Sequence, residues 1–215
     1  MHHWKTAWRS AVRRPLFALT TVAVLAFGIA ANTALFSLVD TVLLRPLPFP
    51  HGERLVTAFE ASPAPSRSVS LVSSAHIEDW NGWGDVFDAV SGMYSENVTD
   101  LSGAEPQRFA GRRVAPRYFQ VFEKPALIGR TFTPDEERFG GPQAAVISEG
   151  MWTRRFQRDA SAVGRRLMIG DAAYTIVGVM PRDFAPAAID LWLPAAFSPF
   201  LLQQRDARFL SGVAR

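Results

Sequence analysis

Hydrophobic residues are concentrated in one uninterrupted run near the start of the chain. Residues 16–39 (LFALTTVAVLAFGIAANTALFSLV) contain no charged side chain. A helix of this length rises about 1.5 Å per residue and spans roughly 36 Å, which exceeds the ~30 Å hydrocarbon core of a bilayer. The pattern therefore predicts a transmembrane helix. Because the amphipathic pattern continues through Asp40 to Leu44, we expect a transmembrane or stalk helix over 16–45.

The residues in front of this run are basic, and they hold no acidic side chain. The cations are Lys5, Arg9, Arg13 and Arg14. The positive-inside rule then predicts that the flank over 1–15 is cytoplasmic, and that the chain after the helix lies on the other side of the membrane. Two structures remain open for the flank. It is either an amphipathic helix with Trp4 and Trp8 at headgroup level or an unstructured basic segment.

Small residues recur on one side of the predicted helix, separated by multiples of four. They are Ala18, Ala26, Ala30 and Ala34. Such a stripe lets a second helix approach closely, although alanine is common in membrane helices and the stripe can also reflect composition alone. Asn32 favours a neighbouring helix, because an amide within hydrocarbon needs a hydrogen-bond partner.

A cleaved signal peptide is the second interpretation of the N-terminal run. The basic start fits it, and Gly28-Ile29-Ala30 resembles a small-residue cleavage site. A signal peptide has an apolar core of about 7–15 residues, however, and this run is longer. The length favours the membrane helix.

Beyond the proline-rich segment 45–50, which predicts an extended elbow, the pattern changes to short runs typical of a mixed α+β domain over 46–215. The predicted strands are 55–59, 97–101, 108–115, 144–148, 166–169, 174–179, 191–194 and 208–214. The predicted helices are 74–80, 86–93, 116–122 and 149–156. We expect Trp80, Trp83 and Phe87 to pack against the sheet, and 60–70 and 129–137 to be loops.

The net charge of +3 does not indicate a nucleic-acid-binding surface. The chain has 23 Lys+Arg and 20 Asp+Glu, and four of the cations lie in residues 1–15. The remainder holds 19 cations against 20 acids, a net charge of −1. The positive excess therefore belongs to the membrane flank, and we expect no nucleic-acid partner.

Residue patterns of known catalytic and cofactor sites are absent from the sequence. There is no cysteine, no G-x-S-x-G, no H-E-x-x-H and no phosphate-binding lysine motif, since the only lysines are Lys5 and Lys124. His76 and Asp79 could share a helix face, but without a third metal ligand they predict a solvated surface. The acidic pair Glu136–Glu137 is likewise expected to face solvent. We expect no enzyme, cofactor or metal site.

Several motifs in a fixed order carry a resemblance to a known family. They are RRPLFAL (13–19), GIAANTALFSLVD (28–40), LLRPLPFP (43–50), FAGRRVAPRYF (109–119), IGRTFTPDE (128–136), VISEGMWTRRF (146–156), VGRRL (163–167), YTIVGVMPRDF (174–184) and DLWLP (190–194). With this order and spacing, the chain resembles the MacB/FtsX-type ABC transporter permeases over about 13–215. It is most similar to the orphan permeases, which have no fused ATPase.

The resemblance implies an N-terminal transmembrane helix and a MacB-like periplasmic core domain. It also implies that this domain divides into a porter-like subdomain, 55–93 with 205–215, and a β-rich insertion, 96–194. In such permeases a separate ABC ATPase subunit moves the membrane helices, and the first helix transmits the motion outward. The implied partners are the bilayer, that ATPase, and other permease helices or a second copy. The implied location is the inner membrane of a bacterium, with a cytoplasmic N-terminus and a single pass.

Three departures from the family pattern are present. Gln157-Arg158 stands where glycine is usual, and Gly170-Asp171, the predicted hairpin turn between 166–169 and 174–179, replaces a hydrophobic-plus-glycine turn; both fall in loops. The larger departure is length: relatives continue into the rest of the periplasmic domain and further membrane helices, so we expect a truncated permease or a stand-alone piece. A second hypothesis is a membrane-anchored periplasmic binding or scaffold protein without ATPase coupling. A third is a secreted hydrolase released by signal cleavage.

Overall fold

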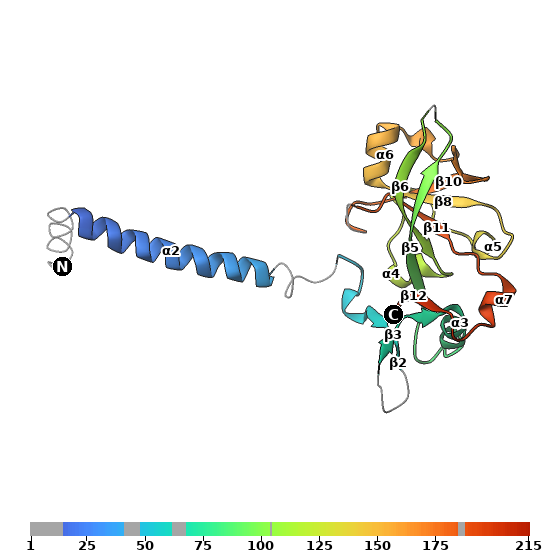
Figure 1. The fold of residues 1–215 in the computed structure, drawn as a ribbon, viewed down its shortest axis with the longest axis horizontal. Helices are drawn as coiled ribbons and strands as arrows, with labels where there is room; N and C mark the ends of the chain where they lie inside the picture. The colour runs from blue at the N-terminus through green and yellow to red at the C-terminus, as the bar shows by residue number, and fades with distance from the viewer. Residues whose placement is uncertain (1–14, 41–47, 62–67, 104, 185–187) are drawn as a thin grey trace. The chain divides into compact units, whose positions relative to one another are not determined.

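The computed structural model describes residues 15–40, 48–61, 68–103, 105–184 and 188–215. The chain divides into two units, residues 1–46 and 47–215, and each is considered separately. In the described part of the first unit, residues 15–39 form one uninterrupted helix, α2 (Pro15–Val39) (Figure 1). Pro15 suits the first turn of a helix, where its missing N–H leaves no hydrogen bond unmade. The predicted flank, with Lys5, Arg9, Arg13 and Arg14, and the predicted continuation over 41–45 lie outside the described residues.

Helix α2 is long and apolar enough to cross a membrane, with the candidate span at Leu16–Val39. None of this span is buried by other parts of the chain. A signal sequence near an N-terminus passes the same test of length and composition. The predicted apolar helix is therefore confirmed as a helix, while its role in anchoring or export depends on the family of the attached domain.

The second unit is an α+β domain, which confirms the predicted fold class. Its strands are β1 (Val56–Ala58), β2 (Glu60–Ala61), β3 (Val69–Ser70), β4 (Val72–Ser73), β5 (Val90–Asp100), β6 (Gln107–Val114), β7 (Ile128–Gly129), β8 (Ala144–Ser148), β9 (Arg166–Ile169), β10 (Ala172–Met180), β11 (Leu191–Pro194) and β12 (Arg208–Ala214). Its helices are α3 (Ser74–Asn81), α4 (Tyr118–Phe122), α5 (Pro134–Glu137), α6 (Glu149–Phe156) and α7 (Pro199–Leu202), with 3-10 turns η2 (Gly52–Arg54) and η3 (Ala160–Ala162).

Ten strands of the described part of the chain form one sheet, and six of them close into a barrel. The strands β5, β6, β11, β8 and β10 follow one another in hydrogen-bonded order, and β9 pairs with β10. The circle closes where Ile169 of β9 pairs with Asp100 of β5. The β6–β11 and β8–β10 pairs are parallel and the other pairs of the circle are antiparallel. Helix α6 lies at one end of the domain (Figure 1).

Strand β8 shows how the sequence fills two cores at once. Ala145 and Ile147 belong to the core inside the barrel, together with side chains of β9, β10 and β11. Ala144 and Val146 belong to a second core on the outer face, which contains Phe184. Because successive side chains of a strand point to opposite faces, a continuous apolar run is what a strand buried on both faces requires.

The other half of the sheet is open and carries α3 and α7. Strand β12 pairs with β5 on one side and with both β1 and β4 on the other. A third core lies here and includes Ile77 of α3, Phe197 before α7 and Leu210 of β12. The long strand β5 runs from this open half into the barrel, so it links the two parts of the domain (Figure 1). The division into a porter-like subdomain and an insertion stays a prediction.

The seam of the barrel is held by a buried carboxylate. Asp100 is 1% exposed and accepts hydrogen bonds from the Met168 amide (2.9 Å) and from the Ser102 amide and hydroxyl (3.1 and 2.8 Å). It also forms an ion pair with Arg155 of α6. Burial raises the pKa of the Asp100 carboxyl, but the hydrogen bonds from Ser102 and the Arg155 guanidinium outweigh burial and hold the pKa below its usual value.

Two glycines are required where β7 pairs with β10, because the two backbones approach each other too closely for a Cβ atom. A Cβ on Gly178 would lie 2.1 Å from the Arg130 carbonyl oxygen, and one on Gly129 would lie 2.3 Å from the Val177 carbonyl oxygen. Gly129 also has φ +73°, a left-handed conformation that glycine adopts without strain. Both glycines belong to the sequence motifs that carried the family resemblance.

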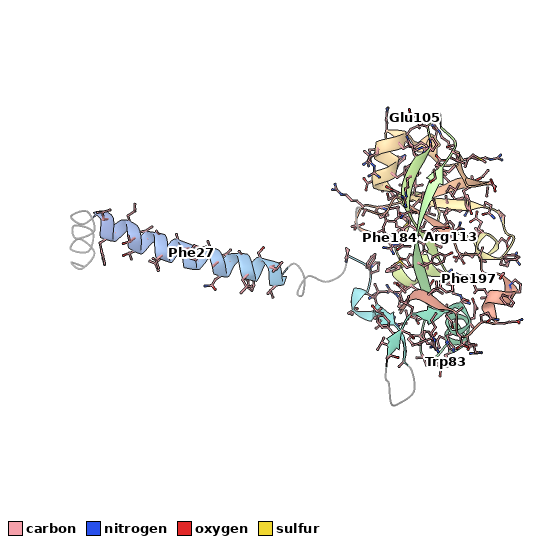
Figure 2. The ribbon with its side chains drawn as sticks, in the orientation of Figure 1. Phe27, Trp83, Glu105, Arg113, Phe184 and Phe197 are labelled. Atoms are coloured by element: carbon pink, nitrogen blue, oxygen red, sulfur yellow. The ribbon has the colours of Figure 1, made fainter. Side chains whose placement is uncertain are left out.

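The predicted helix over 86–93 is wrong, because β5 begins at Val90. The side chain of Asn81 bonds to both the amide and the carbonyl of Val90 (2.9 and 2.8 Å). A Cβ on Gly92 would lie 3.0 Å from a side-chain atom of Ile77 and 3.1 Å from one of Leu210. Pairing with β12, near the other end of the chain, therefore overrides the local apolar spacing. Trp83 is 52% exposed instead of packed, at the end of the domain opposite Glu105 (Figure 2).

Other predicted elements differ at their ends. Helix α3 ends at Asn81, one residue beyond the predicted end, and is capped by Ser73, whose hydroxyl accepts a hydrogen bond from the His76 amide (3.2 Å). Helix α4 begins at Tyr118, because Arg117 has φ 66°, a left-handed conformation that a right-handed helix cannot include. The predicted loop 60–70 contains the paired strands β2 and β3.

Glu136 does not face solvent as expected. It is 7% exposed and lies in α5, within the segment predicted to be a loop. Thr133 and Glu136 form a capping box, and both carboxylate oxygens of Glu136 accept hydrogen bonds from Arg130 (2.7 and 2.8 Å). The unpaired amides at a helix start need acceptors, and a glutamate at this position supplies one.

Candidate functional site

The first described residues of the domain are attached to it by an aromatic ring. Phe49 is half-buried, and its ring centroid lies 4.9 Å from that of Phe122 and 5.9 Å from that of Phe184. Phe184 lies in the middle of the domain (Figure 2). The outer-face core around it includes further rings, Tyr118, Phe119, Phe132 and Trp192. Tilted and edge-on ring pairs contribute roughly 0.5–1.5 kcal/mol each beyond the area that they bury, so Phe49 is a firm attachment point.

Two cations hold the prolines on either side of Phe49. The Lys124 ammonium donates to the Pro48 carbonyl (3.2 Å) and to the Asp183 carboxylate (2.8 Å). The Arg215 guanidinium donates to the Pro50 carbonyl (2.8 Å). These bonds tie the backbone on both sides of Phe49 to side chains of the domain.

Arg215 connects three parts of the domain. Its side chain is 1% exposed and also donates to the Val121 carbonyl (2.7 Å) and to the Glu123 carboxylate (2.8 Å). Its backbone bonds to Ala89 and Asp88 (3.0 and 2.8 Å). The segment 48–54, the end of α4 and the end of β12 therefore meet at one guanidinium. We call 48–54, α4, Lys124 and Arg215 the junction.

The junction is built to hold a chain segment in place. Strand β1 follows it directly and pairs with β12, with Val56 opposite Ala214. The Arg54 guanidinium adds an exposed ion pair with Asp88 (2.7 Å). The ring contacts and the hydrogen bonds to carbonyl groups therefore fix the segment 48–54 to α4 and to the end of β12.

Helix α4, which is part of the junction, has a carboxylate hydrogen-bonded to the residue just before its start. The Arg117 amide donates to both carboxylate oxygens of Glu137 (3.2 and 3.3 Å). Burial raises the pKa of Glu137 to about 7, although the bond from Arg117 lowers it and nearby Glu136 raises it further. The charge of Glu137 therefore changes near neutral pH.

The Glu137→Gln variant is expected to be more stable than the parent at pH 8 and equally stable at pH 4.5. The pKa of an unfolded glutamate is about 4.3. Because the folded pKa is higher, the stability from protonated Glu137 is fully present below about pH 4.3 and is lost as the pH rises through 7. Glutamine keeps an acceptor for the Arg117 amide and does not titrate. Melting temperatures at both pH values measure the effect.

The exposed Glu105→Gln variant is the control for this experiment, and it should change the melting temperature at neither pH. An equal change for Glu137→Gln at pH 4.5 and pH 8 would contradict the role of ionisation. The chain has no cysteine, so no thiol oxidation complicates the comparison.

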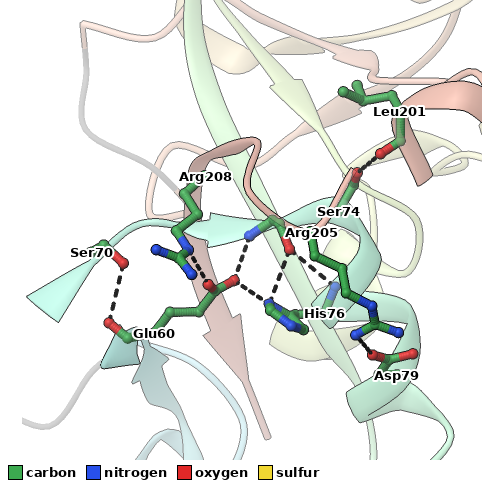
Figure 3. A network of polar contacts seen from close by, with 9 residues as sticks. Glu60, Ser70, Ser74, His76, Asp79, Leu201, Arg205 and Arg208 are labelled. Carbon is green, nitrogen blue, oxygen red and sulfur yellow. Dashed lines mark hydrogen bonds and ion pairs between the residues drawn. The ribbon is translucent and has the colours of Figure 1, made fainter. Parts of the chain in front are cut away.

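A second polar network surrounds the buried Glu60 of β2 (Figure 3). Its carboxylate is within 2.6 Å of His76 Nδ1, 2.8 Å of the Ser73 amide and 2.5 Å of Arg208 Nε. Burial raises the pKa of Glu60, while the Ser73 amide, His76 and Arg208 together hold it below the usual value. Nearby, the Arg205 guanidinium bonds to Asp79 (2.5 Å). The network ties β2, α3 and β12 together.

The residue types in this network do not form a catalytic or metal site. The Ser73 hydroxyl (3.1 Å) and Glu60 both meet the same imidazole nitrogen, whereas a serine hydrolase needs them on opposite nitrogens. His76 and Asp79 have different partners, and no group of three possible ligands occurs among the described residues. His76 was expected on a solvated surface, and this prediction is wrong, because His76 pairs with the buried carboxylate of Glu60.

The residues singled out from sequence lie on α2 where the structure describes them. Ala26, Ala30, Ala34 and Asn32 are exposed and Ala18 is half-exposed. The helix-packing role of these residues stays a prediction. Sequence reasoning missed the junction: Phe49 lay within the recognised proline-rich segment but received no role, and nothing in the sequence indicated that Arg215 would meet Pro50.

Comparison with known families gives one match that spans most of the chain. The model of the family described as MacB-like periplasmic core domain matches residues 18–213. No curated protein sequence matches the chain.

Three solved structures have a similar fold. The periplasmic region of MacB from Actinobacillus actinomycetemcomitans has a TM-score of 0.52 at 16% identity, over 75% of this chain and 73% of that one. The extracellular domain of the noncanonic ABC-type transporter YknZ from Gram-positive bacteria has a TM-score of 0.50 at 19% identity, over 74% and 81%. A domain assigned to a permease protein of Porphyromonas gingivalis has a TM-score of 0.55 at 17% identity, over 78% and 74%.

Proposed function

Because this chain belongs to the MacB-like periplasmic core domain family of ABC-type transporter permeases, we propose that it couples ATP hydrolysis by a partner to movement of its periplasmic domain. In this proposal α2 is the membrane anchor, with its N-terminus in the cytoplasm of a bacterium and the α+β domain outside the inner membrane. A separate ABC ATPase subunit drives the movement. The process served is export or mechanotransmission.

The junction is the observation that supports this proposal. Coupling requires that the segment by which the chain enters the domain be firmly attached to the domain's folded elements. Here Phe49 is packed among rings, and the carbonyls of Pro48 and Pro50 are held by Lys124 and Arg215. Displacement of the segment 48–54 would therefore be passed to α4 and β12.

The second candidate is a membrane-anchored periplasmic binding or scaffold protein without ATPase coupling. Among the described residues one helix is long and apolar enough to cross a membrane, and a single helix cannot by itself enclose a transport path. The same junction would then fix the domain at the membrane surface. The two candidates differ in whether nucleotide changes the junction.

The absence of cysteine allows this difference to be measured with single introduced thiols. His51→Cys lies in the junction at an exposed position, and Glu105→Cys is an exposed control elsewhere on the domain. In native membranes, trapping with ATP and vanadate should change the labelling rate of His51→Cys by about twofold or more and leave Glu105→Cys unchanged. An unchanged rate at both positions, with no ATPase subunit co-purifying from detergent, would favour the scaffold.

The Ala30→Leu variant is expected to weaken association between membrane helices by about fivefold or more, since overpacking a close contact costs roughly 1–3 kcal/mol. Val24→Leu adds bulk on the opposite side of α2 and should have little effect. Crosslinking in membranes measures helix contacts, and circular dichroism should show the domain folded in both variants. Equal crosslinking of the parent, Ala30→Leu and Val24→Leu would mean that the alanine stripe reflects amino-acid composition and does not form a helix contact.

A further inference from the structure

A hollow of about 350 Å³ lies where the start of α6 meets the loop that follows β10. Its apolar lining comes from Pro181, Ile189 and Trp192. Its polar lining includes Glu149 at the start of α6 and the guanidinium side chains of Arg154, Arg158 and Arg182. It lies apart from the junction and from the Glu60 network, which share none of these residues.

The positive charge in this hollow is not fully balanced. Arg154 forms an ion pair with Asp190, and Arg158 forms one with Glu149 (2.6 Å). The other Glu149 oxygen accepts a hydrogen bond from the backbone amide of Arg182 (3.1 Å). The exposed Arg182 side chain has no ion-pair partner in the part of the chain that the structure describes. Three guanidinium groups thus face two carboxylates, which leaves one positive charge.

The backbone accepts strain to bring one of these arginines to the hollow. Gln157 and Arg158 have φ values of 51° and 62°, so two successive non-glycine residues adopt the left-handed conformation. That conformation costs roughly 1 kcal/mol or more for a residue with a Cβ, whereas glycine adopts it freely. This turn places the Arg158 side chain beside Glu149, the first residue of α6. The Arg158 guanidinium also lies 5.0 Å from the centre of the Trp152 ring.

We propose that this hollow binds a small amphiphilic monoanion, with its carboxylate at Arg182 and its apolar body against Pro181 and Ile189. Ligand pockets range over about 300–1,000 Å³, so a hollow near the lower end fits a small molecule. One unbalanced charge matches a single carboxylate better than a doubly charged phosphate. The planar guanidinium can bind a carboxylate through two parallel hydrogen bonds.

Photolabelling of the full chain in nanodiscs of neutral lipid tests this site. The probe is an octanoate that carries a photoreactive diazirine, and the matched probes are the alcohol and the phosphate ester of the same chain length. Peptide mass spectrometry then locates the label. The carboxylate should label peptides that contain Pro181 or Ile189 about fivefold more than the alcohol does, which is the upper end expected for one exposed ion pair.

The Arg182→Gln variant should reduce this labelling about fivefold. Arg166→Gln removes another exposed arginine, which lies outside the hollow, and should leave the labelling unchanged. Equal labelling by carboxylate and alcohol would overturn the proposal, as would labelling confined to α2 or unaffected by Arg182→Gln. Stronger labelling by the phosphate ester would overturn the choice of a monoanion. Each result is independent of coupling to an ATPase.

Discussion

Replacing Asp100 by alanine is expected to lower the free energy of unfolding by roughly 3–5 kcal/mol, the usual cost of breaking a buried ion pair. The variant leaves Arg155 without its carboxylate, and it removes the acceptor for the Met168 and Ser102 amides. These groups lie where β9 returns to β5, so the loss falls on the closure of the barrel. Chemical denaturation at pH 7 measures the change.

The exposed Asp85→Ala variant is the matched control, and its effect should stay within about 0.5 kcal/mol. Acid provides a second test of Asp100. Since its folded pKa is lowered, its contribution is present above the unfolded value of about 3.9 and is lost as the pH falls through the folded pKa. The parent should therefore lose more stability than Asp100→Ala between pH 4 and pH 2. A parallel loss in both proteins would contradict this role.

Replacing Arg215 by alanine is expected to cost roughly 2–4 kcal/mol and to loosen the junction. The variant leaves the buried Val121 carbonyl without the donor that it has here, and a buried unsatisfied group costs about 1–3 kcal/mol. The exposed Pro50 also loses the bond that ties it to β12. Glu123 loses its partner as well. Because these groups belong to different segments, the segment 48–54 should detach from α4 while the barrel stays intact.

Hydrogen exchange measures this local change directly. The amides of Gly52, Arg54 and Leu55 bond within the segment and should exchange faster in Arg215→Ala. Amides of the β8–β10 ladder should keep their protection. Arg205→Ala, which removes only an exposed pair with Asp79, should cost about 0–1 kcal/mol and leave the junction amides unchanged. Unchanged exchange in Arg215→Ala would mean that Phe49, Lys124 and Arg54 hold the segment without Arg215.

The sequence predicted those elements whose cause is local. The strand at Ala144–Ser148 and the helix Glu149–Phe156 are found with the expected bounds. A short apolar run indicates a buried strand, and Ser148 caps the helix through its hydroxyl. The uncharged run that became α2 and the turn at Gly170 were also recognisable, since chain length, missing charge and turn chemistry act within a few residues.

Local patterns failed where a distant partner decides the structure. The segment 86–93 has helical spacing, yet Val90 begins a strand because Asn81 and β12 bind its backbone. Glu136 is a different case, because its partners Thr133 and Arg130 lie only three and six residues before it. The capping box that buries Glu136 is a local signal, and the sequence analysis did not use it.

The sequence by itself determined the apolar helix, the α+β class, most strands of the barrel and, through its ordered motifs, the family. Only the tertiary structure decided that β9 returns to β5 at Asp100 and that Arg215 meets Pro50. These contacts join residues far apart in the chain. They are fixed by the simultaneous pairing of many strands and the burial of their side chains, and no periodicity along the sequence records which distant residue becomes the partner.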